Sequence, residues 1–174
     1  YIGFALVWLP VFILYVHLIA YATDVGVDRE VGVLLLSLLG GFSIPGRLLF
    51  GYVADTVGRI QIFVLNAVGM AALTTALPVL ETPVPLFGFA VLFGITYGGN
   101  AALITPVIAD FFGTTNINAR YGVLATGFGF GALVGPFIAG ATYDSLQSYD
   151  IVFVATGIAA ALGSTLIVVA ERTS

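Results

Sequence analysis

The sequence predicts an all-α integral membrane protein, in which six transmembrane helices form two inverted three-helix repeats. Three observations predict this fold class. Of 174 residues, 60% are hydrophobic and only 8% are charged, whereas soluble domains carry about 25% charged residues. The charges are clustered, so that six apolar stretches remain that are long enough to cross a bilayer core of roughly 30 Å. Finally, a short glycine-containing motif occurs twice in the chain.

The six apolar stretches use nearly the whole chain. They cover residues 1–23, 31–54, 60–80, 82–109, 121–143 and 151–170, and Arg47 is the only charge inside any of them. Strands of a membrane barrel would alternate apolar and polar residues, and segments such as VGVLLLSLLGGF do not. Helices satisfy their own backbone hydrogen bonds in lipid, so we expect helices, with the lipid bilayer as a partner.

Composition also excludes several kinds of site. The chain has no cysteine and a net charge of −4, so we expect no disulfide and no thiolate metal site. No basic patch is available for nucleic acid. No other metal or cofactor site is predicted. All six aspartates lie at the ends of apolar stretches or between them, which argues against an intramembrane aspartyl protease. We therefore do not expect an enzyme.

The loops predict the orientation of the chain. One set of connections carries three arginines, Arg59, Arg120 and Arg172, whereas the other set carries Arg29 alone. The second set also holds most of the acids: Asp24, Asp28, Glu30, Glu81, Asp144 and Asp150. Because arginine is enriched in cytoplasmic loops, we expect a multi-pass protein of the plasma membrane with both termini in the cytoplasm.

An internal repeat divides the chain in two. GRLLFGYVAD, residues 46–55, and GPFIAGATYD, residues 135–144, share the pattern G-x4-G-x3-D at an offset of 89 residues (135 − 46). We therefore expect one membrane domain over residues 1–174, with repeat units of about 1–80 and 81–174. Three helices per unit make the second unit inverted relative to the first, which is common in secondary transporters.

The turn after the second stretch carries the motif G-x-x-x-D-x-x-G-R, formed by Gly51, Asp55, Gly58 and Arg59. Gly58 suits a helix end because glycine tolerates positive φ. The motif resembles the signature loop of the major facilitator superfamily, in which this loop is understood as a latch for one conformational state. A plain interfacial turn would also explain these residues.

The resemblance extends over the whole chain. HLIAYATDVGV and ARYGVLATGFGFGALVGPFIAGATYD are similar to the C-terminal half of the monocarboxylate porter and oxalate–formate antiporter branch. The resemblance implies half of a twelve-helix fold, which agrees with a start at Tyr1 rather than methionine. It further implies a symporter or antiporter for a small organic anion that works by alternating access. An N-terminal six-helix half and a coupling proton are the further partners that the resemblance implies. A channel-like or purely structural six-helix bundle is the alternative.

Arg47 is the strongest candidate for substrate binding. A charge near the middle of a membrane helix costs about 2.5–3.5 kcal/mol, so such residues usually face a wet cavity and pair with another group. The guanidinium can bind a carboxylate through two hydrogen bonds. Pairing with an acid in the other half, or snorkelling to the interface, would also explain it. In monocarboxylate porters an acid precedes the matching arginine by one turn, and Ser43 stands there in this chain, among the expected substrate-binding residues.

Other polar residues in the apolar stretches form two further candidate groups. Thr96, Tyr97 and Asn100 share a helix face in the pattern i, i+1, i+4, and we expect them to line the substrate cavity or to join helices. His17 and Tyr21 lie one turn apart near the outer end of the first stretch. They are candidates for a proton relay or gate, although a hydrogen-bonded packing role is the alternative.

A glycine stripe marks the fifth stretch. Gly127, Gly131 and Gly135 repeat at intervals of four, which lets another helix approach closely. Because the corresponding helix in the superfamily packs against the other half, the resemblance implies that this stripe contacts the N-terminal half.

Overall fold

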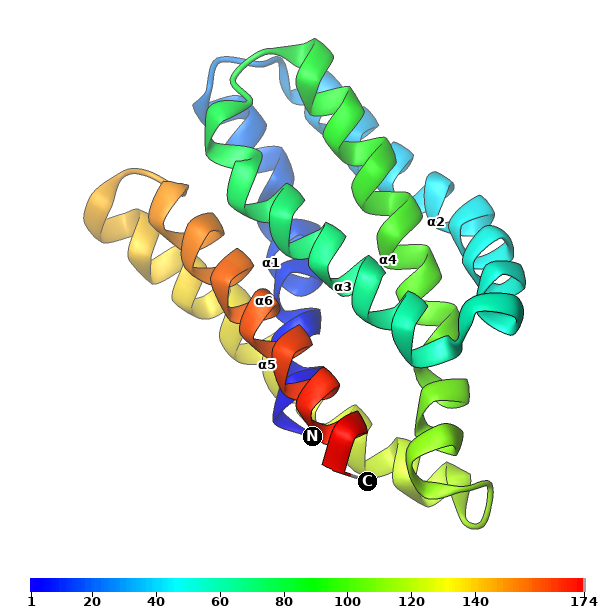
Figure 1. The fold of residues 1–174 in the computed structure, drawn as a ribbon. Coiled ribbons are helices and arrows are strands. Elements are labelled where there is room, and N and C mark those ends of the chain that lie inside the picture. Colours follow the sequence, from blue (N-terminus) through cyan, green and yellow to red (C-terminus); the bar gives the residue numbers. More distant parts are fainter. Residues whose placement is uncertain (174) are drawn as a thin grey trace.

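The computed structural model describes residues 1–173, and six long helices account for nearly all of them (Figure 1). Their bounds are α1 Ile2–Asp24, α2 Arg29–Val57, α3 Arg59–Ala76, α4 Pro83–Phe112, α5 Ile117–Leu146 and α6 Asp150–Thr173, with a short 3-10 helix, η1, at Leu77–Val79. Each of the six, α3 together with η1, is long and apolar enough to cross a membrane. The predicted fold class is thereby confirmed.

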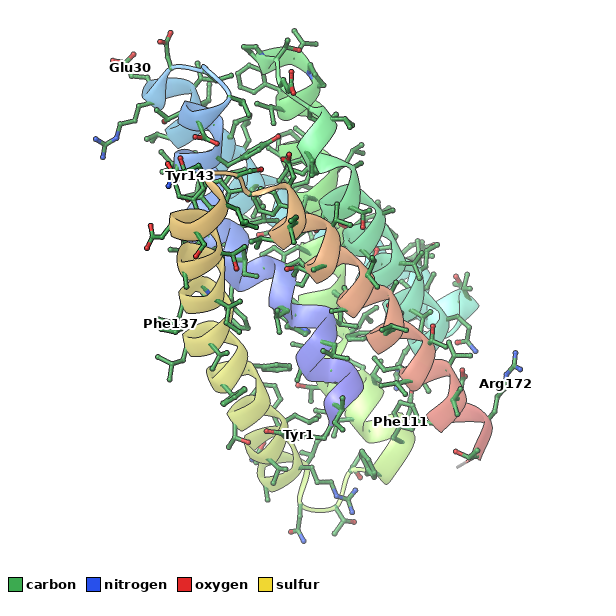
Figure 2. All side chains as sticks on the ribbon, turned by 90° about the vertical axis from the view of Figure 1, so that its left-hand side faces the viewer. Tyr1, Glu30, Phe111, Phe137, Tyr143 and Arg172 are labelled. Atoms are coloured by element: carbon green, nitrogen blue, oxygen red, sulfur yellow. The ribbon has the colours of Figure 1, made fainter. Side chains whose placement is uncertain are left out.

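The even number of helices brings the two chain ends together. Figure 1 shows the N- and C-termini at the same end of the bundle, which we call the terminal end. The opposite end carries the α1–α2, α3–α4 and α5–α6 connections, and we call it the acidic end because Asp24, Glu81 and Asp144 lie there. In Figure 2, Glu30 and Tyr143 lie toward the acidic end, and Tyr1, Phe111 and Arg172 lie toward the terminal end.

The helix contacts have the exchange symmetry that two inverted repeats require. The exchange replaces α1 by α4, α2 by α5 and α3 by α6, and the reverse. Under it, the extensive contact between α2 and α4 corresponds to the contact between α5 and α1, and the contact between α1 and α6 corresponds to that between α4 and α3. The contact between α3 and α6 corresponds to itself. All of these pairs pack together. Of the six candidate spans, α2 and α5 are the least buried, at 22% and 28% of the span window against 44–50% for the others.

Glycines allow α2 and α4 to cross closely. A methyl group added to Gly46 would collide with the carbonyl of Ile95, and one added to Gly98 would collide with the carbonyl of Ser43. Gly94 meets the backbone of Leu39 in the same way. The backbones of the two helices therefore touch here, as small residues permit in membrane helices. The pair Gly94 and Gly98, spaced by four residues, was the signal for this crossing that the sequence analysis missed.

The glycine stripe of α5 packs within this chain, and the contact with another half that we expected for it is wrong. Gly127 faces Tyr1, directly before α1, while Gly131 and Gly135 face Phe12 and Ile13 of α1. All three glycines are buried. The physical reason is the repeat symmetry: the α5–α1 crossing is the counterpart of the glycine-lined α2–α4 crossing, and both lie inside the bundle.

Candidate functional site

Arg47 stands in the middle of α2 and is exposed on the surface of the bundle. Ten residues separate it from the helix end at Val57, so it lies about 15 Å from that end at 1.5 Å per residue. Within residues 1–173 the structure records no acid at ion-pair distance from Arg47. The neighbouring Gly46 and Ser43 are buried against α4. Arg47 follows Ser43 by one helical turn, so it lies at the edge of this contact.

Two tyrosines lie at the level of Arg47. The contacts of Gly46 with Ile95 and of Ser43 with Gly98 place residues 95–98 of α4 beside residues 43–46 of α2. Tyr97 belongs to this segment, and its ring meets the ring of Tyr15 of α1 edge-on at 6.0 Å between centroids. Tyr15 is 42% exposed. Arg47, Tyr15 and Tyr97, from three different helices, therefore lie at one level of the bundle and form the candidate site.

Thr96, Tyr97 and Asn100, which we expected on one face, contact different helices, because Thr96 and Tyr97 point about 100° apart on α4. Thr96 packs against Gly69 of α3, and its hydroxyl donates to the carbonyls of Leu92 and Phe93 within α4. Tyr97 faces α1 instead. Only Tyr97 of the three lies at the site around Arg47.

Asn100 and Ser43 are buried between helices. Asn100 is fully buried, and its amide nitrogen lies 3.5 Å from the sulfur of Met70 in α3. Asn66, which the sequence analysis missed, is buried on α3 one turn before Met70. The Ser43 hydroxyl donates to the carbonyl of Gly40 in its own helix, at 2.6 Å. In this conformation Asn100 therefore contacts α3, and its side-chain oxygen is buried without a hydrogen-bond partner among the described residues.

His17 makes two hydrogen bonds that tie α1 to the second repeat. Its Nε2 lies 3.0 Å from the carbonyl oxygen of Pro136 in α5, which only accepts, so Nε2 carries the proton. Its Nδ1 then accepts from the hydroxyl of Tyr149, at 3.2 Å. Tyr21, one turn further along α1, donates to the carbonyl of Leu77 at 2.7 Å. Both residues therefore hold helices together in this conformation.

Tyrosines and acids surround His17 at the acidic end. Tyr143 donates to Asp24 at 2.6 Å, and its ring stacks on Tyr149 at 4.3 Å between centroids. Burial, followed by the negative charges of Asp24 and Asp144, raises the pKa of Tyr149 above its usual value of 10.0. A raised pKa keeps this phenol protonated near neutral pH, so that it can donate to His17.

The loop motif lies at the terminal end. Gly58 has φ of 124°, a conformation that glycine adopts without strain and that lets α3 begin directly after α2. Arg59 pairs with Asp110 near the end of α4, with 3.1 Å between Nη1 and Oδ1. Both side chains are partly exposed, so the pair contributes at most about 1 kcal/mol to stability. The motif arginine therefore joins α3 to α4 rather than pairing with Asp55.

A separate, largely apolar cavity of about 560 Å³ opens at the terminal end of the bundle. Tyr1, Phe4, Phe111 and Phe112 contribute to its lining, and Arg120 is the charged residue beside them. The Arg120 guanidinium lies over the Phe112 ring and donates to the carbonyl of Gly113 at 3.0 Å. None of the residues around Arg47 lines this cavity, so it is distinct from the site that we describe.

Comparison with known proteins gives one family. A family model described as the Major Facilitator Superfamily matches residues 1–173. Monocarboxylate transporter 12 of Homo sapiens is 34% identical over 158 residues, which are 88% of this chain and 31% of that protein. Monocarboxylate transporter 10 of Homo sapiens is 26% identical over 169 residues, 95% of this chain and 33% of that protein.

A third relative is fungal. The MFS transporter asaE of Aspergillus flavus is 31% identical over 141 residues, 80% of this chain and 32% of that protein. The chain thus spans about a third of the length of the curated relatives that it matches. All three relatives are transporters rather than enzymes, in agreement with the prediction that the chain is not an enzyme.

Proposed function

Because the chain belongs to the major facilitator superfamily, we propose that it forms one six-helix half of a secondary transporter for a small organic anion. The anion would bind through a carboxylate at Arg47, and alternating access would move it across the membrane. An N-terminal six-helix half would supply the other wall of the cavity. The two repeat units of this half would be residues 1–80 and 81–174, related as inverted repeats.

The single observation that carries this proposal is the exposed arginine inside a membrane helix. Arg47 lies well inside α2 and has no acidic partner in the described part of the chain. A charge held in such a place is costly unless it faces water or a counter-ion. A guanidinium offers a planar pair of donors that matches a carboxylate, so the bound anion itself would be the counter-ion.

Every aspartate and glutamate of the chain lies at a helix end or in a loop, so this half would bring a cation but no acid to the site. In a symporter, a coupled proton would then have to use a group other than a carboxylate beside Arg47. We also propose that the protein lies in the plasma membrane with both termini cytoplasmic. The excess of arginine at the terminal end supports this orientation, and thiol labelling of introduced cysteines would check it.

Uptake measurements on the full-length protein test the role of Arg47. The protein would be reconstituted in proteoliposomes and given radiolabelled aliphatic and aromatic monocarboxylates. Arg47→Lys keeps the charge and loses the two-pronged donor, whereas Arg47→Ala loses both. We expect a rise in KM of about tenfold or more for Arg47→Lys, because charge-assisted hydrogen bonds contribute about 1.5–3 kcal/mol, and a larger loss for Arg47→Ala.

Arg29→Lys, at the exposed start of the same helix, is the matched control and should leave uptake unchanged. Unchanged uptake in both Arg47 variants would show that the arginine does not bind the substrate. Failure of the wild type to take up any monocarboxylate would contradict the proposed substrate class.

A further inference from the structure

Five aromatic side chains from three helices meet beside Arg47. Trp8, Phe12 and Tyr15 lie on one face of α1 at spacings of four and three residues. Trp8 contacts Tyr97 of α4 edge-on at 5.6 Å between ring centroids, and Phe128 of α5 at 5.3 Å. Phe12 lies 6.5 Å from Trp8. We call these five residues the ring cluster.

The ring cluster adjoins the Arg47 site directly. Tyr97 lies beside the α2 segment that carries Arg47, because Gly46 contacts Ile95 and Gly98 contacts Ser43 on either side of it. Tyr15 contacts the Tyr97 ring. The rings therefore extend from the level of Arg47 along α1 toward Trp8.

The cluster is not closed off as an ordinary core would be. Tyr15 is 42% exposed, and Phe12, Tyr97 and Phe128 are only partly buried. The indole nitrogen of Trp8 is buried without a hydrogen-bond partner among the described residues, although buried indole N–H groups usually find one. The cluster thus has accessible ring surface and one free donor.

We propose that the ring cluster is a second part of the substrate site and that the transported carboxylate carries an aromatic ring. This inference rests on the proposed function, because Arg47 would hold the carboxylate. The substrate ring would then extend over Tyr15 and Tyr97 toward Trp8. Aromatic rings prefer edge-to-face and offset contacts with one another, and such contacts would distinguish a flat aromatic ring from a saturated ring of similar size.

A matched pair of ligands tests this inference in the full-length protein. Phenylacetate and cyclohexylacetate share a carboxylate, a linker and a six-membered ring, but only the first ring is aromatic. We expect wild-type proteoliposomes to take up radiolabelled phenylacetate with a KM about 3- to 10-fold lower than that for cyclohexylacetate. Tyr97→Leu and Tyr15→Leu should bring the ratio of the two KM values close to one.

Phe137→Leu is the matched control, since Phe137 is 75% exposed on α5 and points away from the bundle (Figure 2). It should retain the preference for phenylacetate. A binding readout that does not need transport is the tryptophan fluorescence of the detergent-solubilised protein. Phenylacetate should change the part of the signal that Trp8→Phe removes, and cyclohexylacetate should do so only at higher concentration.

Equal KM values for the two acids in the wild type would overturn the inference, and so would a preference that survives in both Tyr97→Leu and Tyr15→Leu. If Arg47→Lys still impaired uptake of both acids in that case, the proposed function would stand without the ring cluster. If the Arg47 variants also left uptake unchanged, the proposed function itself would fail.

Discussion

Arg47 and Asn100 show two different environments for a polar side chain inside a membrane protein. Asn100 is fully buried against α3, with Met70 as the contact of its amide nitrogen, and it stabilises a helix crossing. Arg47 is exposed and has no acidic partner in residues 1–173. Only the second arrangement leaves polar groups available to a ligand, and we therefore propose Arg47 and the nearby tyrosines for the binding role.

At the same scale, we predict a packing role for His17. His17→Phe keeps an aromatic ring beside Tyr149 and removes the hydrogen bonds to Tyr149 and Pro136. Because hydrogen bonds in membrane proteins contribute about 0.6 kcal/mol on average, the free energy of unfolding should fall by about 1 kcal/mol. Thermal unfolding of the full-length protein in detergent would measure this, with Tyr149→Phe as the variant that loses one of the two bonds.

The pH profile of uptake separates the packing role from a proton relay. For a packing residue, the shape of the profile between about pH 5 and 8 should be the same in wild type and His17→Phe. A flattened profile without any loss of thermal stability would instead assign the relay role to His17.

At the scale of helices, close crossings are made where glycines let two backbones touch. Gly46, Gly94 and Gly98 allow this between α2 and α4, and the Gly127–Gly135 stripe allows it between α1 and α5. These two crossings correspond under the exchange of the repeats. The crossing of α2 and α4 also places Tyr97 at the same depth in the membrane as Arg47. Helix packing thus determines the geometry of the candidate site.

Gly98→Ala should destabilise the protein by about 1–3 kcal/mol, because the new methyl group would collide with the carbonyl of Ser43 in a packed interface. Gly88→Ala in the same helix meets nothing within 4 Å and should be neutral or slightly stabilising, since alanine favours helix. Melting temperatures of the two variants would show the difference. Equal melting temperatures would contradict the close crossing of α2 and α4.

The sequence predicts the six helices well, because hydropathy is a local signal, and an isolated charge in an apolar stretch is enough to single out Arg47 as a candidate. It does not predict which way each helix is rotated, since rotation depends on contacts between distant segments. Thr96, Tyr97 and Asn100 therefore seemed to share a face, although Tyr97 contacts α1 while the other two contact α3. The ring cluster was missed for the same reason, even though the spacing of Trp8, Phe12 and Tyr15 was visible.

At the scale of the whole molecule, α2 and α5 are the two most sparsely covered helices. These two helices have the smallest buried share of the six, and they flank the bundle in Figure 1. Arg47 belongs to α2 and Phe128 of the ring cluster to α5. A carrier made of two such halves would enclose the site between them, which accounts for an arginine that is exposed in one half alone.

The central claim is that this chain is half of an alternating-access carrier for a carboxylate. A counterflow experiment, which measures the entry of labelled substrate into vesicles that contain unlabelled substrate, tests this claim most directly. Proteoliposomes with the full-length protein would be loaded with unlabelled phenylacetate, and the entry of radiolabelled phenylacetate would be followed. A carrier must return its site across the membrane, so we expect internal substrate to accelerate saturable entry, and Arg47→Ala to abolish the acceleration. Entry that is non-saturable and indifferent to internal substrate would indicate a channel-like bundle and would contradict the account.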